Sequence, residues 1–193
     1  MSLRLSPKPD VETFRLRSFV ERLIEAGEVE LIDQPVPLTE MAGYLDANEK
    51  AVLFQSAGPE SAEVIGNVLG SRSRIGLAFG MDRAQVPEEI NRRISVDQPI
   101  VEINSADAPV HQVVLENEEA DLTALPVHLQ HEMDGGPYLS ASIDYAHDPD
   151  TGLINSGIRR MMLRGRQHAG VDLTAPSDLQ SIFRKMRAGG GSL

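Results

Sequence analysis

Residues 135–166 read GGPYLSASIDYAHDPDTGLINSGIRRMMLRGR, and this stretch decides the fold of the second half of the chain. Apolar residues at 139, 141, 143 and 145 alternate with polar ones, which is the period-two pattern of a half-buried strand. Residues 147–152 predict a turn, because Pro149 fixes φ, the aspartates can close Asx-turns and Gly152 can adopt a positive φ. The chain then returns through residues 154–163, so the stretch predicts a β-hairpin.

The returning strand carries a local concentration of positive charge, with arginines at 159, 160, 164 and 166. A guanidinium group suits a carboxylate or phosphate held by two parallel hydrogen bonds, so the cluster suggests an anionic ligand. The alternative is that these side chains lie on a solvated face and pair with the abundant Asp and Glu. Spacing alone favours the alternative.

Composition limits the classes of function. The 193 residues are 41% hydrophobic, enough for one large domain or two small ones, and the net charge is −11. An acidic chain is unsuited to nucleic acid or to anionic membrane surfaces, so neither is expected as a partner. The sequence has no cysteine, no apolar run of membrane-spanning length and no signal peptide, which predicts a cytoplasmic protein without disulfides or thiolate chemistry.

The first hundred residues predict strands that alternate with short helices. Helices are expected at 16–25, 39–45, 71–79 and 87–94, and strands at 28–33, 51–54 and 64–69. Such alternation indicates a small α/β domain, which we assign to residues 1–106.

Residues 107–193 have a different character, with few helices. Strands are expected at 100–103 and 110–115, ahead of the hairpin, and an amphipathic helix at 178–187 ends the region. A region with this small number of strands cannot easily close its sheet, so the sheet edges would stay open. Open edges favour pairing with another chain, and an oligomer is therefore expected.

The hairpin, together with the QHAGVDL that follows it, resembles the central motif of the UbiD family of decarboxylases, whose members bind prenylated FMN. The order Gly-Gly-Pro-Tyr, strand, Asp-Pro-x-Thr-Gly turn and Asn-x4-Arg strand carries the resemblance. It extends to LRSFVERLIEAGEVELIDQPV and VIGNVLGSRSRIGLAFGM in the first half. The implied fold is α+β, with a small N-terminal α/β domain followed by part of a flavin-reductase-like split β-barrel. Family members are usually more than twice as long as this chain. The resemblance therefore implies that a second chain supplies the remainder, that the gene product is a relic, or that the sequence is a fragment.

The resemblance also implies roles for single residues. Asn155 matches the position that contacts the cofactor phosphate and its metal, Mn²⁺ or Mg²⁺ with K⁺ as a further option. Arg160 matches the catalytic position that contacts the substrate carboxylate, and it is also expected to bind the cofactor, together with Asn155, Gly157 and Ile158. Residues five apart face opposite sides of a regular strand, and a bulge at Gly157 would remove this objection.

Asp178 is the clearest departure, because the family has a histidine metal ligand at this position. Aspartate can itself bind a hard cation. Ser177 or Asp178 is equally suited to cap the following helix, and Ser177 with Gln180 has the spacing of a capping box, so capping is the favoured role.

Three other features suggest little chemistry. His128 and His131, with Glu132 beside them, resemble a metal cluster, but Pro126 and two glycines bracket a loop and no further ligand is evident. Ser140, Ser142 and His168 have no family role, and Tyr138 is expected to pack beneath the Gly-Gly-Pro turn.

The sequence thus supports a UbiD-like (de)carboxylase component for an aromatic, heteroaromatic or α,β-unsaturated carboxylic acid. The acid–base glutamates of the family have no counterpart here, so a second chain is expected to supply them. Two other hypotheses are a non-catalytic scaffold or assembly subunit derived from such an enzyme, and a simple flavin-binding split-barrel protein.

Overall fold

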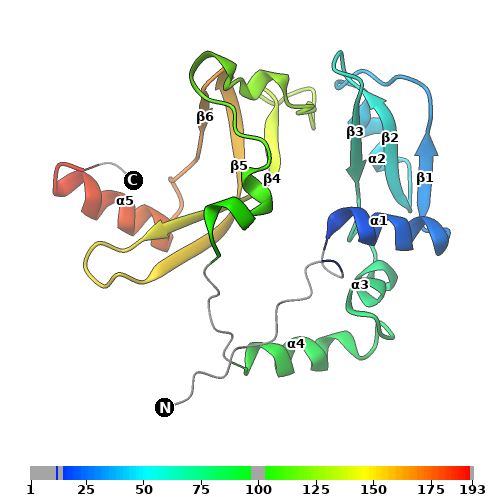
Figure 1. Ribbon diagram of the computed structural model, residues 1–193, viewed down its shortest axis with the longest axis horizontal. Helices are drawn as coiled ribbons and strands as arrows, with labels where there is room; N and C mark the ends of the chain where they lie inside the picture. Colours follow the sequence, from blue (N-terminus) through cyan, green and yellow to red (C-terminus); the bar gives the residue numbers. More distant parts are fainter. Residues whose placement is uncertain (1–11, 13–14, 97–102, 192–193) are drawn as a thin grey trace. The chain divides into compact units, whose positions relative to one another are not determined.

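The computed structural model describes residue 12 and residues 15–96 and 103–191 (Figure 1). Contacts divide the chain into two units. The first comprises Met1–Pro37 and Gly43–His111, and the second Leu38–Ala42 and Gln112–Leu193.

The first unit is built on a three-stranded sheet in the order β1-β2-β3. Strand β1 (Val29–Ile32) runs parallel to β2 (Ala51–Ala57), and β3 (Ala62–Gly66) pairs antiparallel with β2. The helices are α1 (Leu16–Glu25), α2 (Met41–Asp46), α3 (Arg72–Phe79) and α4 (Val86–Ile94). All seven predicted elements are present in this unit, although β3 ends before the predicted residue 69 because Asn67 turns the chain with φ +56°.

The core of the first unit lies between α1 and the sheet. Phe19 and Leu23, one turn apart on α1, pack with Ala51 at the start of β2. Gly27 ends the helix with φ +69°, a left-handed conformation that favours glycine. The amphipathic pattern of residues 16–25 therefore determines which face of α1 is buried.

A buried arginine connects α3 to the same sheet. The Arg74 side chain is 2% exposed and donates from Nη1 to the Glu28 carboxylate at 3.1 Å and to the Glu49 carbonyl oxygen at 3.0 Å. Ser71 caps the helix by accepting a hydrogen bond from the Arg74 backbone N–H. The ion pair is structural.

The second unit contains an antiparallel sheet in the order β4-β5-β6. Its strands are β4 (Tyr138–His147), β5 (Ile154–Gly165) and β6 (His168–Gly170). Of the short 3₁₀ turns that precede them in the sequence, Ser105–Asp107 and Pro109–His111 belong to the first unit, and Asn117–Glu119 and Leu122–Ala124 to the second. The predicted hairpin is confirmed. The short β6 was not predicted, because three residues give no periodic signal.

The predicted strand at 110–115 is wrong. Pro109–His111 forms a 3₁₀ turn, and the apolar side chains that follow are exposed. An apolar run becomes a strand only where another strand pairs with it, and no described strand pairs with this one. Most of the strand predicted at 100–103 lies outside the described residues.

Helix α5 (Asp178–Ala188) covers one face of the β4–β5 hairpin (Figure 1). Leu179 and Ile182 pack against Ala146 of β4, with Leu173 and Met186 at the margin. In its last turn, Lys185 pairs with Asp148 at 2.7 Å and with Asp150 at 3.0 Å, which connects the helix to the hairpin turn.

The second sheet is open. Within the described residues, no further strand pairs with the outer edge of β4 or of β6, and no closed barrel forms. Two three-stranded sheets with helices agree with the expected α+β class.

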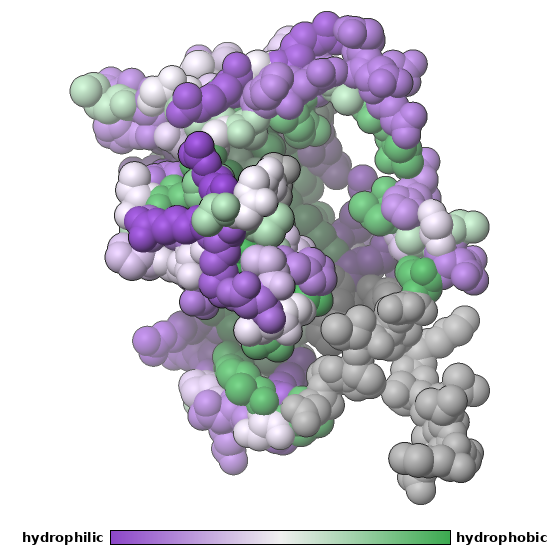
Figure 2. Space-filling model, turned by 90° about the vertical axis from the view of Figure 1, so that its left-hand side faces the viewer, coloured by the Kyte–Doolittle hydropathy of each residue, from purple (hydrophilic) through white to green (hydrophobic). Residues whose placement is uncertain are grey.

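The surface is mostly polar where Figure 2 displays it, with hydrophobic residues in separate patches. None of the helices in the described ranges has the length and apolar character needed to cross a membrane.

Candidate functional site

The two faces of β5 carry different chemistry. Exposure alternates along the strand, with Asn155, Gly157 and Arg159 half-buried and Ile154, Ser156, Ile158 and Arg160 exposed. The half-buried face is the one that α5 covers, because Asn155 pairs in register with Ala146, on which Leu179 packs. Asn155 and Arg160 therefore lie on opposite faces of the strand.

The β-bulge in this hairpin is in β4 and not at Gly157. Leu139 pairs with Met161 and Ser142 with Arg159, so Ser140 and Ala141 together oppose Arg160. At Gly157 the register is regular, opposite Asp144. A bulge increases local twist and can redirect the side chain opposite it. Here it lies opposite the arginine that the sequence singles out.

Gly157 instead leaves room for an ion pair on the α5-covered face. The Arg159 Nε lies 3.0 Å from Asp144 Oδ1, and the two side chains are 22% and 14% exposed. The N–H is not aimed at the oxygen, so the contact is an ion pair without an aligned hydrogen bond. A Cβ at position 157 would lie 3.1 Å from that oxygen and 3.2 Å from an Arg159 nitrogen.

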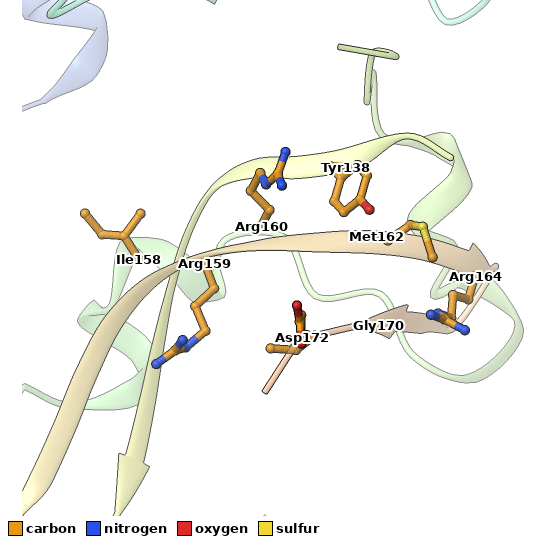
Figure 3. A pocket seen from close by; sticks show the side chains of 9 residues that line it. Tyr138, Ile158, Arg159, Arg160, Met162, Arg164, Gly170 and Asp172 are labelled. Atoms are coloured by element: carbon orange, nitrogen blue, oxygen red, sulfur yellow. The ribbon is translucent and has the colours of Figure 1, made fainter. Parts of the chain in front are cut away.

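Arg160 lies on the other face, beside a hollow of about 580 Å³. Its guanidinium lies over the Tyr138 ring, 5.0 Å from the centroid, in a cation–π contact. Figure 3 shows Arg160 and Arg159 extending from β5 in opposite directions, with Tyr138 beside Arg160. The hollow, which we call the arginine hollow, is lined by Tyr138, Ile158, Arg159, Arg160, Met162, Arg164, Gly170, Val171 and Asp172.

Two of the four clustered arginines form ion pairs and two do not. Arg159 pairs with Asp144, and Arg166 pairs with Asp121 at 2.8 Å and donates to the Glu118 carbonyl oxygen. Arg160 and Arg164 have no ion-pair partner among the residues that the structure describes. The ion-pair interpretation is therefore confirmed for Arg159 and Arg166, and the anion-ligand interpretation stays a prediction for Arg160 and Arg164. Both unpaired arginines line the hollow, as does the paired Arg159.

Asn155 fits the cation that the resemblance implies. Its Oδ1 is buried and has no hydrogen-bond partner within the described part of the chain. A buried, unpaired carbonyl oxygen is costly, and coordination of a hard cation would satisfy it.

Asp178 fits that cation less well. Of the two residues proposed as the cap, Ser177 and not Asp178 is the N-cap of α5, and it accepts a hydrogen bond at 3.2 Å from the Gln180 N–H. Gln180 does not complete a capping box, because its side chain donates to the carbonyl oxygens of Leu173 and Thr174. Asp178 is the exposed first residue of the helix.

The two histidines near Pro126 form no metal site. Among the described residues, no group of three His, Cys, Asp or Glu side chains could hold a metal ion. His131 accepts from the Met133 N–H through Nδ1 at 3.0 Å, and burial lowers the pKa of His128.

Sequence reasoning missed three residues of this region. Tyr138 supports Arg160 rather than simply packing beneath a turn, Asp144 neutralises Arg159, and Asp172 lines the arginine hollow. Asp144 could have been noticed as the one carboxylate on the first strand of the hairpin. Asp172 lies in a loop and gives no periodic signal.

Two family descriptions fit consecutive parts of the chain. Residues 20–94 match the 3-octaprenyl-4-hydroxybenzoate carboxy-lyase N-terminal domain, UbiD_N. Residues 101–193 match the Rift-related domain of the same carboxy-lyases, UbiD.

Known proteins agree with this match. The anhydromevalonate phosphate decarboxylase of Methanosarcina mazei is 32% identical over 178 residues, which are 92% of this chain and 40% of the relative. The UbiD-class enzyme HmfF from Pelotomaculum thermopropionicum, solved with FMN, is 26% identical with a TM-score of 0.83, over 91% of this chain and 40% of that one. The vanillic acid decarboxylase of Sedimentibacter hydroxybenzoicus in its closed form is 25% identical with a TM-score of 0.82, over the same shares of 91% and 40%.

The chain thus spans about 40% of the length of these relatives. The two matched domains follow each other in order and together cover most of the sequence, including the hairpin with Asn155 and Arg160. This chain therefore belongs to the UbiD family and carries its N-terminal domain and its Rift-related domain.

Proposed function

We propose that the chain is a component of a UbiD-like, prenylated-FMN-dependent decarboxylase for an aromatic, heteroaromatic or α,β-unsaturated carboxylic acid. The domain boundary assigned from the sequence, 1–106 and 107–193, is part of this proposal. A second chain supplies the acid–base glutamates, and the working enzyme is an oligomer. One relative supports a second chain, since the vanillic acid decarboxylase ShVdcCD was also solved with a truncated ShVdcD.

One observation carries the proposal. Arg160 projects beside the arginine hollow, has no carboxylate partner among the described residues, and is held by the ring of Tyr138 at 5.0 Å. A guanidinium without a carboxylate partner can bind a substrate carboxylate through two parallel hydrogen bonds and orient it for the loss of CO₂. We assign the catalytic binding role to Arg160.

The cofactor is assigned to the same hairpin. Asn155 would hold the cation, Mn²⁺ or Mg²⁺ with K⁺ as a further option, through its buried Oδ1, and Asp178 would be a candidate second ligand. Gly157 and Ile158 complete the cofactor-binding stretch. When bound, the prenylated flavin supplies the electron sink for decarboxylation. Solved UbiD-class neighbours that contain FMN or prFMN support the flavin.

The test is reconstitution. The chain is co-expressed with the products of adjacent genes, and the purified complex is analysed for bound flavin by absorbance and mass spectrometry and for CO₂ release. We expect Arg160→Ala to lower turnover roughly 100-fold, because the substrate carboxylate loses its orienting contact. Arg184→Ala, which removes an exposed arginine of α5, is the matched control. Equal turnover in the Arg160 variant and the wild type would remove Arg160 from the mechanism.

A second candidate is a non-catalytic scaffold that keeps the UbiD-like surface. It is favoured by Asp178, which replaces the histidine of the family and is exposed at the start of α5. A reconstituted complex that assembles but contains neither flavin nor metal would support the scaffold and contradict the enzyme.

A further inference from the structure

The arginine hollow contains a second unpaired guanidinium for which the proposed function has no role. Arg164 lines the hollow with Arg160 and is four residues further along β5. At a rise of about 3.3 Å per residue, their Cα atoms are about 13 Å apart. Within the described ranges neither side chain forms an ion pair. Two uncompensated guanidinium groups thus border one hollow.

The position of Arg164 depends on a glycine in the neighbouring strand. Gly170 of β6 pairs with Met162, and a Cβ built on Gly170 would overlap Arg164 Nε and lie 3.2 Å from its Cζ. The guanidinium therefore lies directly on the β6 backbone, where any side chain would displace it. Figure 3 shows Arg164 beside Gly170, at the end of β5 beyond Met162.

The charge balance in the hollow favours an anion. Among the described lining residues, Asp172 is the one carboxylate, and it accepts a hydrogen bond at 2.8 Å from the Thr174 N–H. Arg159 is neutralised by Asp144. Two guanidinium groups against one carboxylate make the hollow a positive site in a chain of net charge −11.

We propose that Arg164 is a second anion subsite and that the acid bound here carries a second oxyanion, a further carboxylate or a phosphate, in addition to the carboxylate held by Arg160. This inference rests on the proposed function, in which Arg160 holds the carboxylate that is lost. Tyr138 and Gly170 position the two guanidinium groups, one at each end of the ligand. Arg164 is thus a residue that selects dianionic over monoanionic acids.

Binding to the full chain tests the subsite without catalysis. Three probes are titrated while NMR or calorimetry reports affinity: hexanoate, suberate and 6-phosphonohexanoate. We expect the two dianions to bind about fivefold more tightly than hexanoate at low salt, since one additional charge contact at a partly exposed site is modest. The difference should shrink as salt is added. Comparison of suberate with 6-phosphonohexanoate identifies which second oxyanion is preferred.

Variants then assign the effect. Arg164→Gln should abolish the preference for dianions and leave hexanoate affinity unchanged, whereas Arg184→Gln, which removes the same charge elsewhere, should retain the preference. Gly170→Ala should weaken the preference although it retains both arginines, with circular dichroism to check that the fold is kept.

Equal affinity of wild type for all three probes, or a preference that survives Arg164→Gln, would overturn the subsite. The proposed function fails differently, since it predicts that Arg160→Gln weakens binding of hexanoate itself. The two failures are therefore distinguishable.

Discussion

At the scale of single residues, the half-buried face of the hairpin depends on one ion pair. Asp144 and Arg159 are 14% and 22% exposed, and the two carboxylate oxygens and Arg159 Nε have no hydrogen-bond partner among the described atoms. Each charge compensates the other in a poorly solvated position. Removing one of the two charges should lower the free energy of unfolding more than removing both.

Asp144→Asn is therefore expected to lower the free energy of unfolding by about 1–3 kcal/mol, because Arg159 keeps its charge without a counterion. Urea denaturation measures the change. Adding Arg159→Gln to Asp144→Asn should recover part of the loss. If the double variant instead loses as much unfolding free energy as the two single variants together, the two residues do not interact.

At the scale of elements, α5 is fixed at both ends. Ser177 caps its first turn, and Lys185 in its last turn pairs with two aspartates of the hairpin turn. The apolar contacts of Leu179 and Ile182 with Ala146 lie between these polar ones. Helix α5 thus packs on the face of the hairpin on which Asn155 lies.

Ser177→Ala should destabilise the protein by about 1 kcal/mol, since the Gln180 N–H loses its acceptor. Asp178→Asn should cost less, about 0.5 kcal/mol, from a weaker interaction with the helix dipole. Thermal or urea unfolding compares the two. In the reconstituted complex, metal content that falls with Asp178→Asn would make Asp178 a ligand, and unchanged content would contradict that role.

The Lys185 contacts should give a defined pH dependence. A hydrogen bond from Lys185 lowers the pKa of Asp148, and its hydrogen bonds with Asp148 and Asp150 raise the pKa of Lys185. The stabilisation from Asp148 is present above its unfolded pKa of about 3.9 and is lost as pH falls through the lowered folded value. That from Lys185 is present below its unfolded pKa of about 10.4 and is lost as pH rises through the raised folded value.

Lys185→Met should therefore destabilise the protein across neutral pH, with an effect that decreases as pH falls below about 4 or rises above about 10. Urea midpoints measured between pH 3 and pH 11 check this. A difference from wild type that stays constant over the whole range would contradict the assignment.

At the scale of the whole molecule, the second unit presents an unfinished surface. Ile143 and Ile158 are cross-strand partners on the hollow side of the hairpin and are 59% and 82% exposed, and both edges of the described sheet are unpaired. An apolar sheet face with free edges favours association with another polypeptide.

The isolated chain is therefore expected to self-associate with increasing concentration, and Ile158→Lys should shift it toward monomer. Sedimentation velocity measures the shift. Ile94→Lys, at a 77% exposed position of α4, is the control and should leave association unchanged. A monomeric wild type at all concentrations would contradict this expectation.

The sequence alone determined the elements whose signals are local. Helical spacing predicted α1 and α5, alternation predicted β4, the turn at 147–152 with the apolar return predicted β5, and the motif order in residues 135–166 predicted the family. These signals succeed because periodicity and turn chemistry depend on residues close in the chain. They also placed a cap at Ser177 or Asp178, and the structure shows that Ser177 is the cap.

Only the tertiary structure decided which residues act together. The sequence set Asn155 and Arg160 in one motif, but pairing with β4 and packing of α5 place them on opposite faces, and the bulge lies at Ser140 and Ala141 rather than at Gly157. The partners of Arg159 and Arg166 were decided in the same way, because Asp144 and Asp121 are distant from them in sequence and meet them only in the folded chain. Register and long-range pairing depend on contacts between separate segments, and no pattern within a single segment contains that information.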